Sequence, residues 1–406
     1  MKIEISTVKG FSDYLPPESL KRKAIKEIIE KNFKLYGFLP VETPIIEFDE
    51  LMRSDATNED EAISDRFKLK DKGGRNLGLR YEFTFQLARI FKENPNIKLP
   101  FKRYQIGPVF RDEPVSSARS RQFTQCDIDI IGDSSISADA ECISVFSDIL
   151  KELEIDAEFE VNNRKLLNSI IESVEINNIK EVIKELDKLD KVGQDTVMAE
   201  LRRFTSPNQI ITLFKLLDKD LSFFKDNVFD GAEELESLIA KCKSYGIKIK
   251  FNPTLARGLS YYTGNIFEAK ISDSKDSIAG GGRYDDIVGR YLPNKIPAVG
   301  FSFGLERLSQ LASVELEISP KVIIISFDQE KESISLAKKL RKNSISCSIT
   351  EGQPSKALDY ANSLKIPYII FLGKEEIDAK KFKLKDMQSG NENLLTEKQL
   401  INKLKK

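Results

Sequence analysis

The nine-residue stretch Ala256-Arg257-Gly258-Leu259-Ser260-Tyr261-Tyr262-Thr263-Gly264 combines one arginine, two glycines and two adjacent tyrosines. Arginine is a fixed cation, and glycines let the backbone or a ligand approach closely. The surrounding residues predict a strand, on which two adjacent tyrosines would point to opposite faces. One ring could then pack while the other offered its hydroxyl to a ligand. A hairpin with a surface arginine would explain the stretch equally well, so other parts of the chain are needed to choose.

The composition of the chain limits its possible functions. The 406 residues are enough for two or three domains, and a net charge of −1 gives no overall cationic signal for nucleic acid or membranes. Any site for a polyanion must therefore be local. No run approaches about 18 apolar residues, the first residues form no signal-peptide core, and the four cysteines form no Cys-x-x-Cys pair. These observations predict a cytoplasmic protein with reduced thiols and no membrane partner.

Histidine is absent from the chain, as is tryptophan. Without histidine, Ser-His-Asp triads, Cys-His pairs and His-ligated metals are excluded. Catalysis would have to use arginine, lysine, carboxylates, tyrosine or a bound metal ion. No Gly-x-x-x-x-Gly-Lys-Ser/Thr loop occurs, so a P-loop nucleotide site is excluded as well.

Apolar spacing and turn residues divide the chain into regions of different character. Residues from about 165 to 245 are helix-rich and charged, which is typical of an inserted helical module. From about residue 315, strands alternate with helices, which indicates a small α/β domain with a local net charge of about +6. The glycine run 280–282, most simply a turn, precedes a predicted helix over 284–291. The other predicted helices are 17–36, 84–91, 137–153, 331–342, 355–364 and one beginning at 305, and the predicted strands are 38–46 (interrupted at Pro44), 76–81, 102–110, 122–132, 247–267, 297–303, 322–327, 344–350 and 368–372.

One predicted strand carries a row of polar side chains. Phe123, Gln125, Asp127 and Asp129 share one face of it, and mainly apolar residues occupy the other. Two carboxylates on a central strand are costly unless cations or ligands meet them. The pattern therefore indicates either a binding surface or a solvated outer face of a sheet.

Three arginines, Arg111, Arg119 and Arg121, lie around the loop 112–120 that leads into this strand. The loop is longer than a hairpin requires, and long loops between good strands are often functional. Because guanidinium groups bind phosphate oxygens bidentately, the cluster suits a triphosphate. Arg307 lies in the first turn of the helix beginning at 305, where the helix dipole also favours an anion.

These segments occur in the order of a known set of motifs. Phe110-Arg111-x-Glu113 with its loop resembles motif 2 of class II aminoacyl-tRNA synthetases, Gly304-Leu305-Glu306-Arg307 resembles motif 3, and the unit ending near Pro44 resembles motif 1. The stretch from Arg257 to Gly264 is similar to the signature of one family, the histidyl-tRNA synthetases, in archaeal- and eukaryotic-like variants. Further matches to that family are Leu79-Arg80-Tyr81-Glu82-x-Thr84, Gln125-Cys126-Asp127-x-Asp129, Lys9-Gly10-Phe11-Ser12-Asp13 and the closing α/β domain.

The resemblance implies an α+β fold. A class II catalytic domain with an antiparallel sheet would span residues 1–315, with a helical insertion at about 170–240, and an α/β anticodon-binding domain would span 320–406. It implies a homodimeric ligase that activates L-histidine with ATP and Mg²⁺ and transfers it to tRNA(His). In-line attack of a carboxylate on a phosphoryl group needs positioning and positive charge rather than a general base, so a site without histidine side chains can perform it.

The resemblance also implies roles for single residues. For ATP, it places Arg111 on the α-phosphate, Glu113 on the adenine amino group, Phe123 on the adenine ring, and Arg121 and Arg307 on the outer phosphates. For histidine, it places Glu82 and Thr84 on the α-amino group, Gln125 near the carboxylate, and Asp129 with Tyr262, beside Tyr261, on the imidazole. Arg257, with Arg111, would be catalytic by stabilising charge at the α-phosphate.

The chain departs from the family at a few positions. Ser260 replaces a common aspartate, Thr124 stands where histidine or tyrosine is frequent, and Phe83, Phe85 and Gln86 are unusual after Glu82. Three alternatives remain. One is a catalytically inert paralogue acting as a regulatory subunit in histidine biosynthesis, another is a class II synthetase for another amino acid, and the third is a tRNA-binding module without catalysis.

Overall fold

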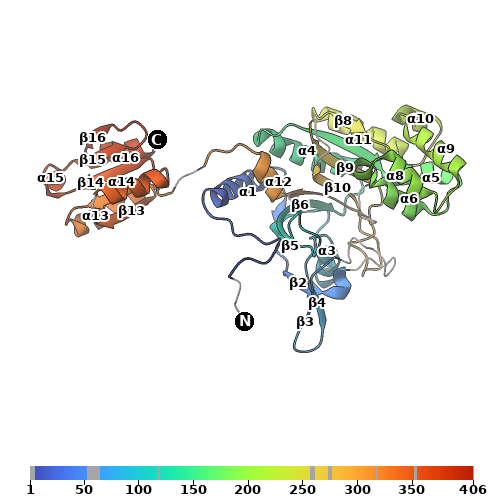
Figure 1. The fold of residues 1–406 in the computed structure, drawn as a ribbon, viewed down its shortest axis with the longest axis horizontal. Coiled ribbons are helices and arrows are strands. Elements are labelled where there is room, and N and C mark those ends of the chain that lie inside the picture. Colours follow the sequence, from blue (N-terminus) through green and yellow to red (C-terminus); the bar gives the residue numbers. More distant parts are fainter. Residues whose placement is uncertain are drawn as a thin grey trace. The chain divides into compact units, whose positions relative to one another are not determined.

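The computed structural model describes residues 5–52, 65–116, 119–256, 261–272, 277–316, 319–351 and 354–405. The chain divides into two compact units, Met1–Glu315 and Leu316–Lys406 (Figure 1). None of the described helices is long and apolar enough to cross a membrane.

An eight-stranded sheet forms the centre of the first unit. Its strand order is β1-β5-β6-β11-β10-β9-β7-β8. The pairs β1–β5 and β7–β8 are parallel, and the five other pairings are antiparallel. The strands are β1 (Leu39–Pro40), β5 (Phe101–Phe110), β6 (Gln122–Ile131), β7 (Ala157–Asn163), β8 (Ile249–Phe251), β9 (Asn265–Ile271), β10 (Ser277–Arg283) and β11 (Ala298–Gly304).

Helices cover one face of this sheet. The helix α1 (Glu18–Leu35) contacts α4 (Ile136–Glu152) and α12 (Leu305–Leu311), and both α4 and α12 contact the strands β6 and β11 (Figure 1). Phe146 of α4 stacks on Phe301 and Phe303 of β11, with ring centroids 4.1 and 4.0 Å away. Because side chains alternate along a strand, these apolar contacts direct the intervening polar and glycine positions of β6 and β11 to the opposite face.

A group of helices is inserted between β7 and β8. Their apolar sides belong to the same core as the central sheet. One of them, Pro207–Leu217, begins with a capping box in which Ser206 and Gln209 satisfy each other's backbone groups. The helices are α5 (Arg164–Ser173), α6 (Ile179–Leu186), α7 (Leu189–Val192), α8 (Gln194–Leu201), α9 (Pro207–Leu217), α10 (Leu221–Asp226) and α11 (Ala232–Ser244).

A smaller antiparallel sheet has the order β2-β4-β3 and leads into the helix α3. Its strands are β2 (Ile46–Phe48), β3 (Lys68–Lys70) and β4 (Asn76–Leu79), β2 is followed by the short helix η1 (Asp49–Met52), and α3 spans Phe85–Glu93. The single strand predicted over 38–46 is therefore wrong, because β1 and β2 belong to different sheets.

The second unit is a five-stranded sheet with helices. The order is β13-β12-β14-β15-β16, in which β12 pairs in parallel with β13 and β14, and the last two pairings are antiparallel. Its own apolar core lies between the sheet and the helices. The elements are β12 (Val322–Ser326), α13 (Glu330–Lys342), β13 (Cys347–Glu351), α14 (Pro354–Ser363), β14 (Tyr368–Leu372), α15 (Lys374–Asp378), β15 (Phe382–Asp386), β16 (Glu392–Leu395) and α16 (Glu397–Lys405).

Two predictions near the glycine run are wrong. The glycines 280–282 are not a turn but part of the central strand β10, and a Cβ on Gly281 would clash with the backbone of Gly300 on β11. Residues 285–291 form successive turns rather than a helix. The amide of Tyr284 donates to Ala298 O and that of Asp285 to Thr263 Oγ1, so the sheet and a side chain use the first donors of the predicted helix.

Candidate active site

A cavity of about 280 Å³ lies on the polar face of the central sheet. Nine of the twelve residues that the sequence suggested for the site line it: Glu82, Thr84, Arg111, Phe123, Gln125, Asp129, Tyr261, Tyr262 and Arg307. Glu113 and Arg121 lie outside this lining, and Arg257 lies outside the described residues. The cavity therefore gathers side chains from segments up to 225 residues apart, as a binding site requires.

Asp129 is a buried acidic group of the site. Its Oδ2 lies 2.6 Å from Nη2 of Arg103, which is fully buried on β5, and its Oδ1 accepts a hydrogen bond from the Tyr284 hydroxyl. Burial raises the pKa of the Asp129 carboxyl, and Arg103 opposes the rise. A Cβ at position 300 would collide with Oδ1 of Asp129, so the close approach of β11 requires glycine there.

Two further carboxylates line the cavity, and each has one oxygen that lacks a hydrogen-bond partner among the described residues. Glu82 accepts a hydrogen bond from the Tyr261 hydroxyl at 3.1 Å, and Asp127 accepts one from Gln125 Nε2 at 2.7 Å. Within the described part of the chain, Glu82 Oε1 and Asp127 Oδ1 are buried without a hydrogen-bond partner. Burial raises the pKa of both carboxyls to about 7. A buried carboxylate oxygen that lacks a partner favours a cationic ligand.

Arg111 also lines the cavity and lies between two aromatic rings. Its guanidinium carbon lies 4.3 Å from the ring centroid of Tyr81 and 5.0 Å from that of Phe123. Its Nε is buried and has no hydrogen-bond partner among the described residues. A guanidinium held by aromatic stacking keeps its donors available for an anion.

The loop after β5 and the residue that follows it carry the two described site residues outside the lining, Glu113 and Arg121. Glu113 accepts hydrogen bonds from the Tyr81 hydroxyl at 3.3 Å and from Arg119 at 3.2 Å. Arg121 donates to the backbone oxygen of Glu113 at 3.2 Å and lies 3.3 Å from Asp112. The loop thus places both signs of charge beside the cavity.

A polar cluster behind Phe123 connects three elements. Glu306 accepts a hydrogen bond from Arg22 Nη2 at 2.8 Å and from the backbone amide of Thr124 at 3.0 Å, and Arg22 also donates to Thr124 Oγ1 at 3.0 Å. The neighbouring Arg307 donates to the backbone oxygen of Ser277. The cluster holds α1, β6 and α12 together directly behind the cavity.

The comparisons with known proteins agree over almost the whole chain. The family model for histidyl-tRNA synthetase matches residues 10–308, and the model for an anticodon binding domain matches residues 321–406. The chain belongs to the histidyl-tRNA synthetase family. A histidine–tRNA ligase of Bacillus cereus is 38% identical over 413 aligned residues, covering 96% of this chain and 95% of that protein.

Solved structures show the same fold. The crystal structure of histidyl-tRNA synthetase from Nostoc sp. PCC 7120 superposes with a TM-score of 0.87 at 28% identity and covers 100% of this chain and 99% of that one. A structure described as an ATP phosphoribosyltransferase regulatory subunit/histidyl-tRNA synthetase, from Bacillus halodurans, has a TM-score of 0.75 at 22% identity over 89% of this chain and 97% of that one, a likeness of fold. The predicted α+β class II architecture is confirmed.

The two signature tyrosines do not lie on a strand as predicted. Residues 261–264 form a turn and an irregular segment before β9, and the rings of Tyr261 and Tyr262 are 5.0 Å apart, both at the cavity. The prediction that they point to opposite faces is therefore wrong. Asn265 is the first residue that pairs with β7 in the sheet, so the preceding residues are free of strand geometry.

Three residues of the site were not given a role from the sequence. Alternation along the strand places Asp127 in the polar row, but it predicts neither the hydrogen bond of Asp127 to Gln125 nor its second oxygen without a partner among the described residues. Arg103 carries no local signal, because its pairing with Asp129 depends on the register of β5 against β6. The incorrect prediction of a helix over 284–291 gives Tyr284 no place in the site. Its position directly after a glycine-rich strand is a signal in the sequence that could indicate one.

Most of the residues that depart from the family pattern lie in the described part of the chain, and their surroundings can be given. Phe83 is buried, and its ring lies 4.9 Å from the Arg80 guanidinium. Phe85 meets Tyr261 edge to face at 5.8 Å. Gln86 is buried, and neither its amide oxygen nor its nitrogen has a partner in the described ranges. Thr124 accepts the Arg22 hydrogen bond described above, and Ser260 lies outside the described residues.

Proposed function

We propose that this chain is a histidine–tRNA ligase that activates L-histidine with ATP and transfers it to tRNA(His). One observation carries the proposal: a single cavity is lined both by buried carboxylate oxygens that have no hydrogen-bond partner among the described residues and by an arginine stacked on aromatic rings. An amino acid and a nucleotide can therefore meet in it with opposite charges matched.

The carboxylates of the cavity suit the amino acid. Glu82 and Thr84, at the start of α3, would bind the α-ammonium group, and Gln125 would lie near the carboxylate. Asp129 and Tyr262, with Tyr261 beside them, would recognise the imidazole, whose two nitrogens can donate and accept hydrogen bonds. A pocket built to pair polar groups discriminates strongly against amino acids that leave those groups unpaired.

The arginines and the ring of Phe123 suit ATP. Phe123 would stack on the adenine, Glu113 would accept from its amino group, and Arg111 would contact the α-phosphate. Arg121 and Arg307 would hold the outer phosphates. Among the described residues no three Cys, Asp or Glu side chains cluster as a metal site, so Mg²⁺ would enter as part of the Mg²⁺·ATP substrate, on phosphate oxygens and water.

The chemistry follows from this placement. A carboxylate oxygen of histidine forms a bond to the α-phosphorus, the bond from that phosphorus to the bridging oxygen breaks, and pyrophosphate leaves. Arg111, and Arg257 from the signature, would stabilise the negative charge that builds on the α-phosphate oxygens. A terminal ribose hydroxyl of the tRNA then attacks the carbonyl carbon of the adenylate, and AMP leaves.

The two units would divide the work. Residues 1–315 would form the catalytic domain, with the helical insertion at about 170–240, and residues 320–406 would bind the anticodon. The +6 local charge of the second unit, in a chain of net charge −1, supports this because phosphate contacts dominate affinity for nucleic acid. Protein synthesis places the ligase in the cytoplasm, and the four cysteines are buried and free, which suits a reducing compartment.

Exposed apolar side chains close together in the sequence support a homodimer. Four apolar side chains on β1, β2 and the segment between them are 43–58% exposed: Leu39, Ile45, Ile46 and Phe48. β1 is also an edge strand of the central sheet. Exposed apolar groups and edge strands are typical of interaction surfaces, so a second copy would cover them. Light scattering at micromolar concentration should give twice the mass of the 46.1 kDa chain.

ATP–pyrophosphate exchange, measured with each amino acid in turn, tests the activity. Histidine alone should support exchange, and tRNA(His) should then be charged. An inert paralogue would give no exchange, and a class II synthetase for another amino acid would respond to that amino acid. Either result would overturn the proposal.

A further inference from the structure

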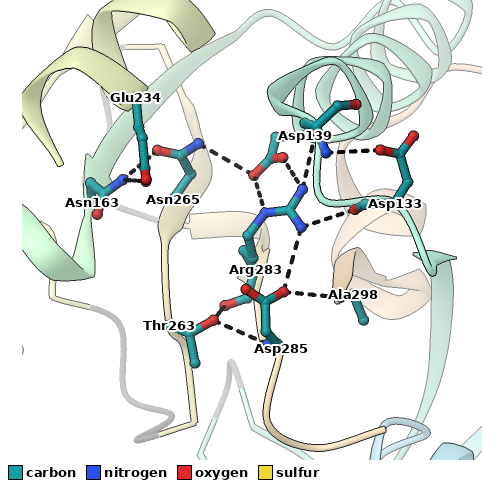
Figure 2. Close-up of polar contacts among 10 residues, drawn as sticks. Asp133, Asp139, Asn163, Glu234, Thr263, Asn265, Arg283, Asp285 and Ala298 are labelled. Atoms are coloured by element: carbon teal, nitrogen blue, oxygen red, sulfur yellow. Dashed lines mark hydrogen bonds and ion pairs between the residues drawn. The ribbon is translucent and has the colours of Figure 1, made fainter. Parts of the chain in front are cut away.

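Arg283 ends the strand β10, one residue before Tyr284, and its guanidinium is enclosed behind the cavity (Figure 2). Its Nε lies 3.4 Å from Oδ1 of Asp139 on α4, and its Nη2 bonds the other oxygen of that carboxylate. It also donates to the backbone oxygens of Asp133 at 3.0 Å and Ser135 at 3.1 Å. Arg283 thus attaches β10 to the start of α4.

The backbone and neighbours of Arg283 hold the segment that carries the signature tyrosines. The oxygen of Arg283 accepts the amide of Thr263, the residue after Tyr262, at 2.8 Å. Thr263 Oγ1 accepts the amide of Asp285 at 3.1 Å, and Asp285 lies 3.4 Å from Arg283 Nη1. Figure 2 shows these contacts as a closed ring around the end of β10.

Close packing holds the side chain of Tyr262 next to these contacts. A Cβ at Gly282 would lie 2.8 Å from the Tyr262 ring, so that ring rests directly on the backbone of β10. Tyr284 follows Arg283 in the chain and donates to Asp129. Both tyrosines are therefore next in sequence to residues of this network. Tyr262 precedes Thr263, which is bonded to Arg283, and Tyr284 follows Arg283 itself.

The same network continues away from the cavity. Asn265 Nδ2 donates to Asp139 Oδ1 at 3.3 Å, and Asn163 Nδ2 donates to Asn265 at 2.9 Å and to Glu234 at 3.0 Å. Asn163 caps the first inserted helix, α5, and Glu234 lies in the first turn of α11. Through the buried residues Asn265 and Asn163, the ion pair is thereby linked to the helix α5 and to Glu234 on α11.

We infer that Arg283, through Asp139 and Thr263, is a positioning residue for histidine recognition: it sets where the Tyr262 and Tyr284 hydroxyls stand without touching the substrate. The inference rests on the proposed function. A buried ion pair adds little net stability compared with an apolar replacement, but its fork of hydrogen bonds defines a geometry closely. Small displacements of a binding group cost much of its effect.

The test separates positioning from folding. Asp139→Asn keeps the shape of the side chain but removes the charge that orients the guanidinium, and Arg283→Lys keeps the charge but removes the fork. In both variants the KM for histidine in pyrophosphate exchange should rise about tenfold or more, while the KM for ATP stays within about twofold. Equal changes in both constants, or no change for histidine, would overturn the inference.

A matched control breaks another buried pair of the same sheet. Glu160 lies 2.9 Å from Lys270, between β7 and β9 and away from the tyrosines. Glu160→Gln should lower the melting temperature and leave the KM for histidine unchanged. If it raises that constant as much as Asp139→Asn does, a general loss of stability explains both and the inference is wrong.

Thr263→Val provides a second route if the Asp139 and Arg283 variants do not fold. Valine keeps the size of the side chain but cannot accept the Asp285 amide, so the KM for histidine should rise several-fold with ATP unaffected. An unchanged histidine constant in a folded Thr263→Val protein would contradict the inference. Failure of the wild-type protein to exchange pyrophosphate with histidine would instead contradict the proposed function.

Discussion

Arg103 and Asp129 form a buried ion pair of 2.6 Å beneath the cavity, joining two neighbouring strands at directly opposed positions. Neither side chain can be changed without leaving the other charge unpaired in the interior. Asp129 therefore balances the charge of Arg103, and under the proposed function it has a second task, presenting a carboxylate to histidine.

Replacement of Asp129 by asparagine should reveal both tasks. We expect the melting temperature to fall because Arg103 loses its counter-charge, and the KM for histidine to rise at least about tenfold, since a lost charged hydrogen bond is worth roughly 1.5–3 kcal/mol. The KM for ATP should change far less. If the two Michaelis constants move together, Asp129 only holds Arg103 in place and the imidazole is recognised elsewhere.

The pH dependence of histidine binding should follow Glu82 and Asp127. Burial raises the pKa of each carboxyl to about 7. Each is thus protonated in the free protein below pH 7 and must ionise to bind an ammonium group. The KM for histidine should increase as the pH falls from about 8 to 6, with the KM for ATP less affected.

Asp127→Asn is the control for that titration, because free histidine itself titrates equally for both proteins. The variant should show a shallower dependence. The stability of the protein should depend on pH in the opposite direction to histidine binding. A carboxyl whose pKa is higher in the folded than in the unfolded state destabilises the folded state increasingly as the pH rises to about 7. The wild-type protein without ligand should therefore lose more stability than Asp127→Asn between pH 5 and 8; identical melting curves would contradict the assignment.

Arg22→Ala should weaken ATP binding selectively. Arg22 joins Glu306 and Thr124, which directly adjoin Arg307 and Phe123, so its loss should loosen both proposed ATP contacts. We expect the KM for ATP to rise about tenfold and that for histidine to change little. Lys31→Ala is the control. It removes an ion pair on the outer side of the same helix, in which Lys31 Nζ lies 2.7 Å from Glu152, and it should leave both Michaelis constants unchanged. Equal effects of the two substitutions would exclude a specific role for Arg22.

A chain ending at Ser313 should keep the first reaction and lose most of the second. All described residues of the cavity precede this point, and the second unit has its own core. If the shortened protein stays dimeric, it should catalyse histidine-dependent pyrophosphate exchange but charge tRNA(His) poorly. Normal charging would show that residues 320–406 are not the anticodon-binding domain.

Local patterns predicted the frame of the molecule and most of the cavity. The polar row on β6 follows from alternation along one strand, and Arg307 follows from the start of one helix, so neither needs knowledge of distant partners. Arg103 could not be assigned in this way, because its partner is fixed by the register between two strands.

The errors around the glycine run have a related cause. Three glycines in sequence favour a turn when taken alone, but here they let β10 pass close to β11 and to the Tyr262 ring. The adjoining tyrosine segment, likewise, takes its conformation from Thr263 and Arg283 rather than from its own propensity. In both places contacts across the sheet decide the local structure.

The glycines Gly281 and Gly300 line the floor of the cavity with backbone alone, since a Cβ at either of them would meet main-chain atoms or Asp129. Evolution or a protein engineer therefore cannot retune the depth of this pocket by exchanging floor residues. New amino-acid selectivity has to come from the walls, where Tyr262 and Tyr284 can be trimmed to admit a larger side chain while the floor stays as it is.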